Sequence, residues 1–332
     1  MTTAAIDTTR LDVLDGWRGV SILLVLAGHL FPLGPKRFEL NGAVAAMGMA
    51  IFFTLSGFLI TSFLLRRPEV VPFLIRRFCR IVPLAWAASA LVLAIKGSSP
   101  EVWLAHLLFY ANLPPFWLTD STAHFWSLCL EVQFYVATAA LVAVTGRRGL
   151  WALPLLCVAV TITRVVFHQP MTIVTWFRID EILAGCTLAL IAHQHAHARV
   201  ATTLGRVPPA LLLLGLLAAC HAQAEPLNYL RPYFAAAAVG ATLFNRDTLV
   251  AAAMRTKTLA YIAKVSYALY VFHPLLAQTW LGAGDVWSRY LKRPLLLAVL
   301  FAVAHLSTFK FERRFIDLGH RLTSGRRERA VA

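Results

Sequence analysis

Long apolar runs recur along the entire chain, and they restrict its fold more than any other feature of the sequence. The runs are about 15 to 23 residues long, and few charged residues interrupt them. Of the 332 residues, 59% are hydrophobic and only 14% are charged. Soluble domains carry about 25% charged residues, so this chain needs lipid as its solvent. The sequence therefore predicts an all-α polytopic membrane protein.

The apolar runs predict about ten transmembrane helices. We expect the spans at Gly16–Leu33, Ala43–Leu65, Ile81–Ile95, Phe125–Thr145, Leu150–Phe167, Glu181–His193, Val207–His221, Tyr233–Leu249, Val265–Trp280 and Leu295–Phe309. Several are shorter than the roughly 20 residues that a crossing helix needs. We expect the stretch Val102–Tyr110 to form an interfacial or re-entrant helix on the outer side.

The basic residues favour one orientation in the membrane. With the N-terminus inside, 22 of the 31 Lys and Arg residues fall in cytoplasmic segments, as the positive-inside rule requires. We therefore expect an N-in, C-in, multi-pass protein of the inner (plasma) membrane. The net charge of +15 arises from these short loops. Because no nucleic-acid recognition motif accompanies it, we expect no nucleic-acid partner.

The cysteines and the histidine-rich segment indicate neither disulfides nor a metal. The five cysteines lie in or beside apolar runs without a CxxC pair, which is typical of small packing residues. The segment His193–His197 has histidines at i, i+2 and i+4, a spacing that does not put all three on one helix face. We interpret this segment as a solvated loop and expect no metal ion.

Ionisable side chains inside a bilayer are costly, and the first span contains His29. Arg18 lies eleven residues earlier, so both project from nearly the same helix face, roughly 16 Å apart along the axis. Asp15 shares that face and can pair with Arg18. One helix face thus connects a cytoplasmic cation to a deep imidazole. The alternative interpretation is a snorkelling Arg and a His that only bonds between helices.

A second polar face is expected in the span Phe125–Thr145. Ser127, Glu131 and Tyr135 recur at i, i+4 and i+8, so they lie on the same side of a helix. Counted at 1.5 Å per residue, Glu131 lies about 9 Å and His29 about 6 Å below the outer surface. These depths permit a His–carboxylate pair.

Three further motifs contain polar residues among apolar ones. Ser56 and Gly57 lie in an apolar helix, where such small residues usually allow close packing. Tyr267 and Tyr270 recur at helical spacing, and Pro274 is expected to kink or loosen the helix beside His273. The cluster Arg76-Arg77-Phe78-Cys79-Arg80 suits phosphate groups, because guanidinium groups bind them through bidentate hydrogen bonds. Its alternative role is that of a positive-inside signal alone.

Seven motifs together reveal a family resemblance. They are LDGWRG at 14–19 leading to His29, FFTLSGFLIT at 52–61, RRFCRIVP at 76–83, WSLCLEVQFY at 126–135, FRIDEILAG at 177–185, VSYALYVFHPL at 265–275 and FER at 311–313. In these motifs and their order, the chain resembles the acyltransferase-3 family of membrane-bound O-acyltransferases, which modify bacterial glycans and some secondary metabolites. Many relatives carry a fused esterase-like domain. We instead expect 1–332 to be a single transmembrane domain without one.

The resemblance implies a ten-helix core that takes acyl groups from cytoplasmic acyl-CoA and delivers them to an acceptor across the membrane. His29 is the expected general base for the acceptor hydroxyl, because imidazole titrates near neutral pH. Glu131 would orient or stabilise it, and Arg18 completes the expected catalytic group. Direct transfer and an acyl-enzyme intermediate are both compatible with these residues.

The resemblance also implies the partners and the remaining site residues. The expected co-substrate is acyl-CoA, most simply acetyl-CoA, and the acceptor is a glycan, a glycolipid or a glycosylated metabolite in contact with membrane lipids. The cytoplasmic arginines expected to bind the CoA phosphates are Arg76, Arg77 and Arg80, together with Arg18. The expected supporting residues are Asp15, Ser56, Tyr135, Tyr270 and His273.

Two other functions are compatible with parts of the pattern. A polytopic transporter or flippase of a lipid-linked sugar also contains buried ionisable groups. However, no sequence repeat is present, and the Arg cluster is expected on the side where acyl-CoA is found. A non-catalytic scaffold does not explain the cost of His29 and Glu131 in a bilayer.

Overall fold

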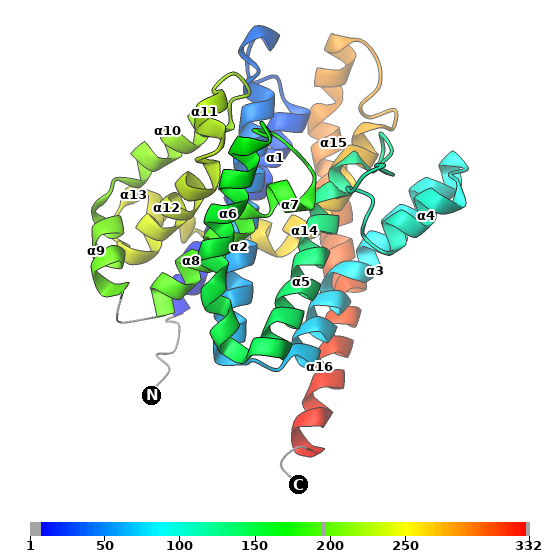
Figure 1. The fold of residues 1–332 in the computed structure, drawn as a ribbon. Coiled ribbons are helices and arrows are strands. Elements are labelled where there is room, and N and C mark those ends of the chain that lie inside the picture. Colours follow the sequence, from blue (N-terminus) through cyan, green and yellow to red (C-terminus); the bar gives the residue numbers. More distant parts are fainter. Residues whose placement is uncertain (1–7, 194–196, 330–332) are drawn as a thin grey trace. The chain divides into compact units, whose positions relative to one another are not determined.

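The computed structural model describes residues 8–193 and 197–329, and every regular element in these ranges is a helix (Figure 1). The chain forms two compact units. The first contains Met1–Arg67, Arg147–Thr172 and Trp176–Ser266, and the second contains Pro68–Gly146, Ile173–Thr175 and Tyr267–Ala332. Each unit is therefore assembled from segments that lie far apart in the sequence.

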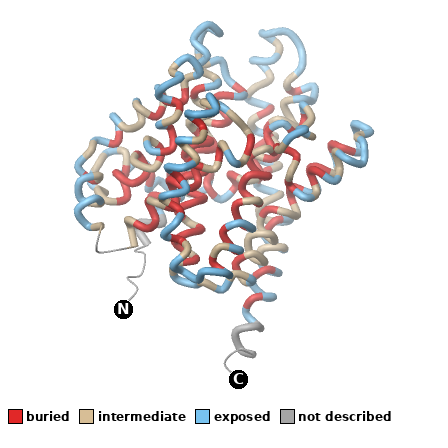
Figure 2. Tube along the Cα trace, in the orientation of Figure 1, coloured by how far each residue is buried: buried red, intermediate tan, exposed pale blue. Residues whose placement is uncertain are grey.

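The first unit is organised around α2 (Leu40–Arg66), which is buried along most of its length (Figure 2). It packs extensively against α1 (Thr8–Leu30) and α8 (Asp180–His193). The remaining helices of this unit are α6 (Leu153–Val166), α9 (Ala198–Arg206), α10 (Pro209–Cys220), α11 (Glu225–Asn228), α12 (Arg231–Phe244), α13 (Leu249–Met254) and the start of α14 (Lys257–Ala277). The short α7 (Thr175–Arg178) begins at the boundary between the units.

Trp17 is the central side chain of this packing. It is 1% exposed and belongs to a core cluster with residues of α2, α8 and α12. Its indole Nε1 donates a hydrogen bond to Thr242 Oγ1 at 2.8 Å. The bond satisfies the one polar atom of the ring, so the indole can be buried without leaving an unpaired donor.

Glycines bring α2 and α8 into direct backbone contact. A Cβ atom on Gly57 would lie 1.9 Å from the carbonyl oxygen of Ile182, and one on Gly185 would lie 2.0 Å from that of Thr54. No real Cβ occupies such a position, so only glycine fits at either contact. The close packing predicted for the Ser56-Gly57 motif is therefore confirmed.

We expect Gly57→Ala to destabilise the protein by about 1–3 kcal/mol, because the added methyl group forces the two helices apart. The matched control is Gly42→Ala on the same helix, since a Cβ on Gly42 meets nothing within 4 Å. Unfolding in mixed detergent micelles measures both variants. Equal stability of the two variants would contradict the proposed backbone contact.

The second unit is organised around α3 (Val70–Lys96), which packs against α5 (Trp126–Thr145) and α16 (Arg313–Arg329). It also contains the rest of α14, α4 (Pro100–Leu107), α15 (Val286–Leu306) and the π-helical turn η5 (Ser307–Glu312). Three-residue to seven-residue 3₁₀ turns complete the chain: η1 (Lys36–Phe38), η2 (Ala123–Phe125) and η3 (Gly146–Ala152).

Side-chain hydrogen bonds fix the segment that connects α4 to α5. His106 Nδ1 donates to Val102 O at 2.7 Å, and His106 Nε2 lies 2.8 Å from Thr122 Oγ1. Burial lowers the pKa of His106, so the neutral ring is favoured. Its Nε2 then accepts a hydrogen bond from the Thr122 hydroxyl. Gln133 Nε2 donates to Phe109 O at 2.7 Å. The start of α5, which carries Glu131, is thereby attached to its preceding loop.

Each of the ten predicted spans coincides with a helix, but the lengths differ from the expectation. Six helical segments of the described residues are long and apolar enough to cross a membrane. They are Asp12–Leu30, Leu40–Arg66, Val70–Lys96, Ala123–Val166, Lys257–Ala277 and Val286–Ser324. The pair α9 and α10 passes the same criteria together, with a bend of 86° between the two helices. The number of ten spans and the N-in, C-in orientation stay predictions.

Four helix starts correct the sequence analysis. The helices α1, α3, α14 and α15 begin at Thr8, Val70, Lys257 and Val286, earlier than the expected Gly16, Ile81, Val265 and Leu295. Hydropathy marks only the apolar part of a helix, whereas Arg is a good helix former and lets the helix extend into polar sequence. The Arg cluster therefore lies within α3. The predicted helix at Val102–Tyr110 is present as α4, and residues 194–196 of the histidine-rich segment lie outside the described residues.

Candidate functional site

The first unit positions the predicted base on an unbroken helix. Asp15, Arg18 and His29 all belong to α1, which is continuous from Thr8 to Leu30. The spacing of eleven residues therefore places Arg18 and His29 on nearly the same face, as predicted. The His29 side chain is exposed and Arg18 is half-buried, whereas the predicted supporting residue Ser56 is buried on α2.

Asn41, which sequence reasoning missed, holds the turn that carries His29. Its side-chain Nδ2 donates to Gly28 O at 2.7 Å and to Phe31 O at 2.6 Å, and its Oδ1 accepts from Leu33 N at 3.3 Å. These bonds satisfy carbonyl groups that the end of a helix otherwise leaves unpaired. A Cβ on Gly28 would lie 2.5 Å from the Asn41 carbonyl oxygen. The turn is thus fixed directly against α2.

The second unit brings one predicted arginine next to the predicted carboxylate. Tyr135 is 1% exposed, and its hydroxyl donates to Glu131 Oε1 at 2.5 Å. The Arg77 guanidinium lies 5.8 Å from the Tyr135 ring centroid and 5.9 Å from that of Phe73, within the range of a cation–π interaction. Arg77 on α3 and Glu131 on α5 thus share one buried tyrosine. Arg76 and Arg80 lie half-buried on the same helix α3.

A second polar group joins α5 to α14. The hydroxyl oxygens of Ser127 and Tyr270 are 2.7 Å apart, and the Tyr270 hydroxyl donates to the carbonyl oxygen of His124. The ring centroids of His124 and His273 are 5.7 Å apart. His273 Nδ1 donates to Tyr270 O at 2.8 Å. The structure thus brings Tyr270 and His273 together with His124, which the sequence analysis missed because it precedes the apolar run of α5.

The hydroxyl protons in these two groups are already engaged. Tyr135 donates to Glu131, and Tyr270 donates to the His124 backbone. A hydroxyl has one proton, so neither tyrosine has a second one to give to a substrate in this arrangement. For these two supporting residues the geometry favours a positioning role over hydrogen-bond donation to a substrate.

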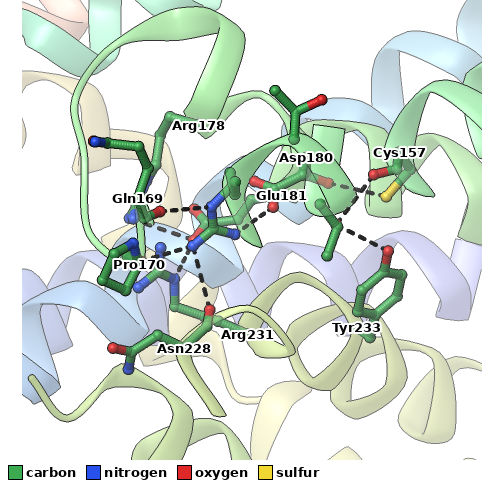
Figure 3. Close-up of polar contacts among 12 residues, drawn as sticks. Cys157, Gln169, Pro170, Arg178, Asp180, Glu181, Asn228, Arg231 and Tyr233 are labelled. Atoms are coloured by element: carbon green, nitrogen blue, oxygen red, sulfur yellow. Dashed lines mark hydrogen bonds and ion pairs between the residues drawn. The ribbon is translucent and has the colours of Figure 1, made fainter. Parts of the chain in front are cut away.

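The first unit contains a buried ionic cluster, and the sequence did not predict that its residues come together (Figure 3). Arg164 pairs with Asp180, and Arg231 Nε donates to Glu181 Oε1 at 2.5 Å. Arg178 Nη2 lies 3.3 Å from the same Glu181 oxygen. The side chains of Arg164, Asp180, Glu181 and Arg231 are 0% exposed. The cluster ties α6, α8 and α12 together, and we interpret it as the structural centre of this unit.

Further bonds of Arg164 extend this cluster into the neighbouring loops. Its guanidinium donates to Gln169 O at 3.2 Å, to Pro170 O at 2.7 Å and to Asn228 O at 3.4 Å. One buried arginine thus holds the loop after α6 and the end of α11.

No group of three or more His, Cys, Asp or Glu residues suited to a metal ion is found among the residues that the structure describes.

Comparison with known proteins agrees with the resemblance. The acyltransferase-3 family, described as an acyltransferase domain, matches residues 11–309. The peptidoglycan O-acetyltransferase OatA of Listeria monocytogenes serovar 1/2a is 26% identical, over 90% of this chain and 54% of that protein. Nodulation protein 10 of Rhizobium leguminosarum bv. viciae is 23% identical, over 73% of this chain and 76% of that protein.

The extent of these matches defines what they establish. The chain spans about half the length of the Listeria relative. No solved structure matches it. The family match, in contrast, includes every predicted site residue, from Asp15 on α1 to His273 on α14. On this ground the chain belongs to the acyltransferase-3 family.

Proposed function

We propose that the protein is an integral membrane O-acyltransferase that moves an acyl group from acyl-CoA to a hydroxyl of a carbohydrate-containing acceptor. The family match over residues 11–309 carries this proposal. The relative named as a peptidoglycan O-acetyltransferase supports acetyl as the acyl group and a glycan as the acceptor. We place the protein in the inner membrane, with acetyl-CoA supplied from the cytoplasm.

The arrangement around Tyr135 supports the donor part of this proposal. Arg77 is held over the rings of Phe73 and Tyr135 on one side of α3. A guanidinium held in this way loses less freedom when it binds a phosphate group, and such preorganisation raises affinity. We propose that Arg77, with Arg76 and Arg80, binds the phosphates of CoA.

The proposed chemistry moves the acyl group from a thioester, acyl-CoA, to a hydroxyl oxygen of the acceptor, which becomes an oxygen ester. His29 removes the proton from the acceptor hydroxyl, whose oxygen attacks the thioester carbonyl carbon. A C–O bond forms and the C–S bond breaks, so the CoA thiolate leaves and takes up the proton from His29. Glu131, held by Tyr135, would orient the imidazolium or stabilise its charge. Arg18 and Asp15 lie on α1, the helix of His29, and would act at its cytoplasmic end.

Purified protein in lipid nanodiscs tests the proposed function. We expect labelled acetyl groups from acetyl-CoA to appear on soluble peptidoglycan fragments, with release of one CoA for each transfer. A transporter or flippase of a lipid-linked sugar would release no CoA under these conditions. Absence of both label transfer and CoA release across a panel of glycan, glycolipid and glycosylated acceptors would overturn the proposal.

Replacement of Arg77 by lysine tests the donor site. Lysine keeps the charge but lacks the planar guanidinium that stacks on Tyr135 and forms bidentate bonds, so Arg77→Lys should raise the KM for acetyl-CoA about tenfold. The KM for the acceptor should not change. The matched control is Arg67→Lys, since Arg67 is exposed on the chain between α2 and α3. An unchanged donor KM in Arg77→Lys would exclude Arg77 from the donor site.

A further inference from the structure

The C-terminal helix α16 lies beyond the part of the chain that matches the family. The match ends at residue 309, whereas α16 runs from Arg313 to Arg329. Within the second unit α16 nevertheless packs along α3, the helix that carries the arginine cluster (Figure 1). An element outside the matched domain therefore contacts the helix to which we assign the donor phosphates.

Gly319 of α16 packs closely against α3. A Cβ atom on Gly319 would lie 3.0 Å from Cys79 Cβ, 3.3 Å from Cys79 Sγ and 3.6 Å from Arg76 Cα. The contact therefore falls on the turn of α3 that contains the arginine cluster. A larger side chain at position 319 would push α16 away from that turn.

Thr323 lies one helical turn after Gly319 and bonds Arg76 directly. Arg76 Nε donates to Thr323 Oγ1 at 2.8 Å. The Thr323 hydroxyl in turn donates to Gly319 O at 2.9 Å, and its side chain is only 5% exposed. Because the hydroxyl has one proton and an i−4 carbonyl to receive it, its lone pairs remain oriented toward Arg76.

The π-helical turn η5 determines which face of α16 meets α3. A π turn holds an extra residue, and each residue rotates the following helix by about 100°. Ser307 and Thr308 each donate to Glu312 Oε1 at 3.1 Å, which stabilises the turn from within. The position of Gly319 and Thr323 toward α3 thus depends on a local feature that is itself held by hydrogen bonds.

We propose that α16 is part of the donor site, in which Thr323 and Gly319 act as positioning residues for Arg76. Two arginines of the cluster are then fixed by different helices, Arg76 by α16 and Arg77 by Tyr135 of α5. A guanidinium group that is already fixed loses less side-chain freedom when it binds one of the CoA phosphates. This inference rests on the proposed function, since it deepens the assignment of the arginines to the CoA phosphates.

Thr323→Val tests the inference in the full-length protein, because valine has nearly the shape of threonine but offers no oxygen to Arg76. We expect the Kd for CoA, measured by calorimetric titration, to rise about tenfold. The KM for acetyl-CoA should rise by the same factor, while kcat and the acceptor KM stay unchanged. Thr323→Ser retains the hydroxyl and should retain wild-type affinity.

Ser324→Ala is the matched control, because Ser324 is the adjacent exposed hydroxyl and donates to His320 O at 2.8 Å on the same helix. It should leave the Kd for CoA unchanged. Equal Kd values for Thr323→Val and the wild-type protein would overturn the inference while leaving the proposed function intact. A wild-type protein that does not bind CoA would instead overturn the proposed function.

Discussion

Glu181→Gln is expected to destabilise the protein by about 3–5 kcal/mol, which is the usual cost of removing one partner from a buried ion pair. Glu181 Oε1 accepts from Arg231 at 2.5 Å and lies 3.3 Å from Arg178. Both guanidinium groups are buried, so neither can recover its lost interaction from water. Glutamine has the same shape, so the variant removes charge and leaves the packing nearly unchanged. Unfolding in mixed detergent micelles measures the loss.

The exposed ion pair of α16 provides the control for this prediction. Arg313 Nε and Asp317 Oδ2 are 3.9 Å apart, and their side chains are 70% and 53% exposed. Removing an exposed pair of this kind costs less than about 1 kcal/mol, so Asp317→Asn should leave the stability nearly unchanged. If Glu181→Gln lowers the free energy of unfolding no more than Asp317→Asn does, the buried cluster is not central to stability.

The sequence could not predict this cluster because its members are distant along the chain and lie at the ends of apolar runs. Arg164 lies near the end of α6, before a loop, and Arg231 begins α12, after one. A basic residue at such a place usually signals membrane topology alone. Their partners are 16 and 50 residues away. Helical periodicity relates residues within one helix, but it does not say which helix ends meet. Only the packing of α6, α8 and α12 brings these charges together.

Relations within a single helix, in contrast, were predicted correctly. The i, i+4 spacing placed Glu131 beside Tyr135, and the structure joins them by a hydrogen bond of 2.5 Å. The small residues at Ser56-Gly57 indicated close packing, which Gly57 makes against the backbone of α8. These predictions succeeded because the geometry of a helix fixes the relative positions of its own residues.

Helix ends and contacts between helices were the weaker predictions. The start of α3 was placed at Ile81 rather than Val70, since the arginine cluster at 76–80 interrupts the apolar sequence of the helix. Asn41 and Thr323 were overlooked because each acts on another helix through its side chain. Each is a small polar residue of a common type, and nothing in its immediate sequence identifies the carbonyl or guanidinium group that it bonds.

His29→Ala is expected to lower kcat for acyl transfer by about 10²–10⁴-fold, the range typical for removal of a general base. The His29 side chain is exposed, so its truncation opens no cavity in the core. The turn that carries it is held through backbone atoms, by Asn41 bonds to Gly28 and Phe31 and by the contact of Gly28 with α2. The variant should therefore fold with wild-type stability, and labelled acetyl transfer in nanodiscs measures its activity.

The pH dependence of this reaction distinguishes a base from a merely structural histidine. A base acts in its neutral form, so the wild-type rate should rise with pH as the imidazole loses its proton, and His29→Ala should lose this rising limb. The matched control is His305→Ala, because His305 is another exposed histidine in a helical segment that is long and apolar enough to cross a membrane, on α15. It should keep both the rate and the pH profile. Normal transfer by folded His29→Ala, or an unchanged rising limb in that variant, would exclude His29 as the base.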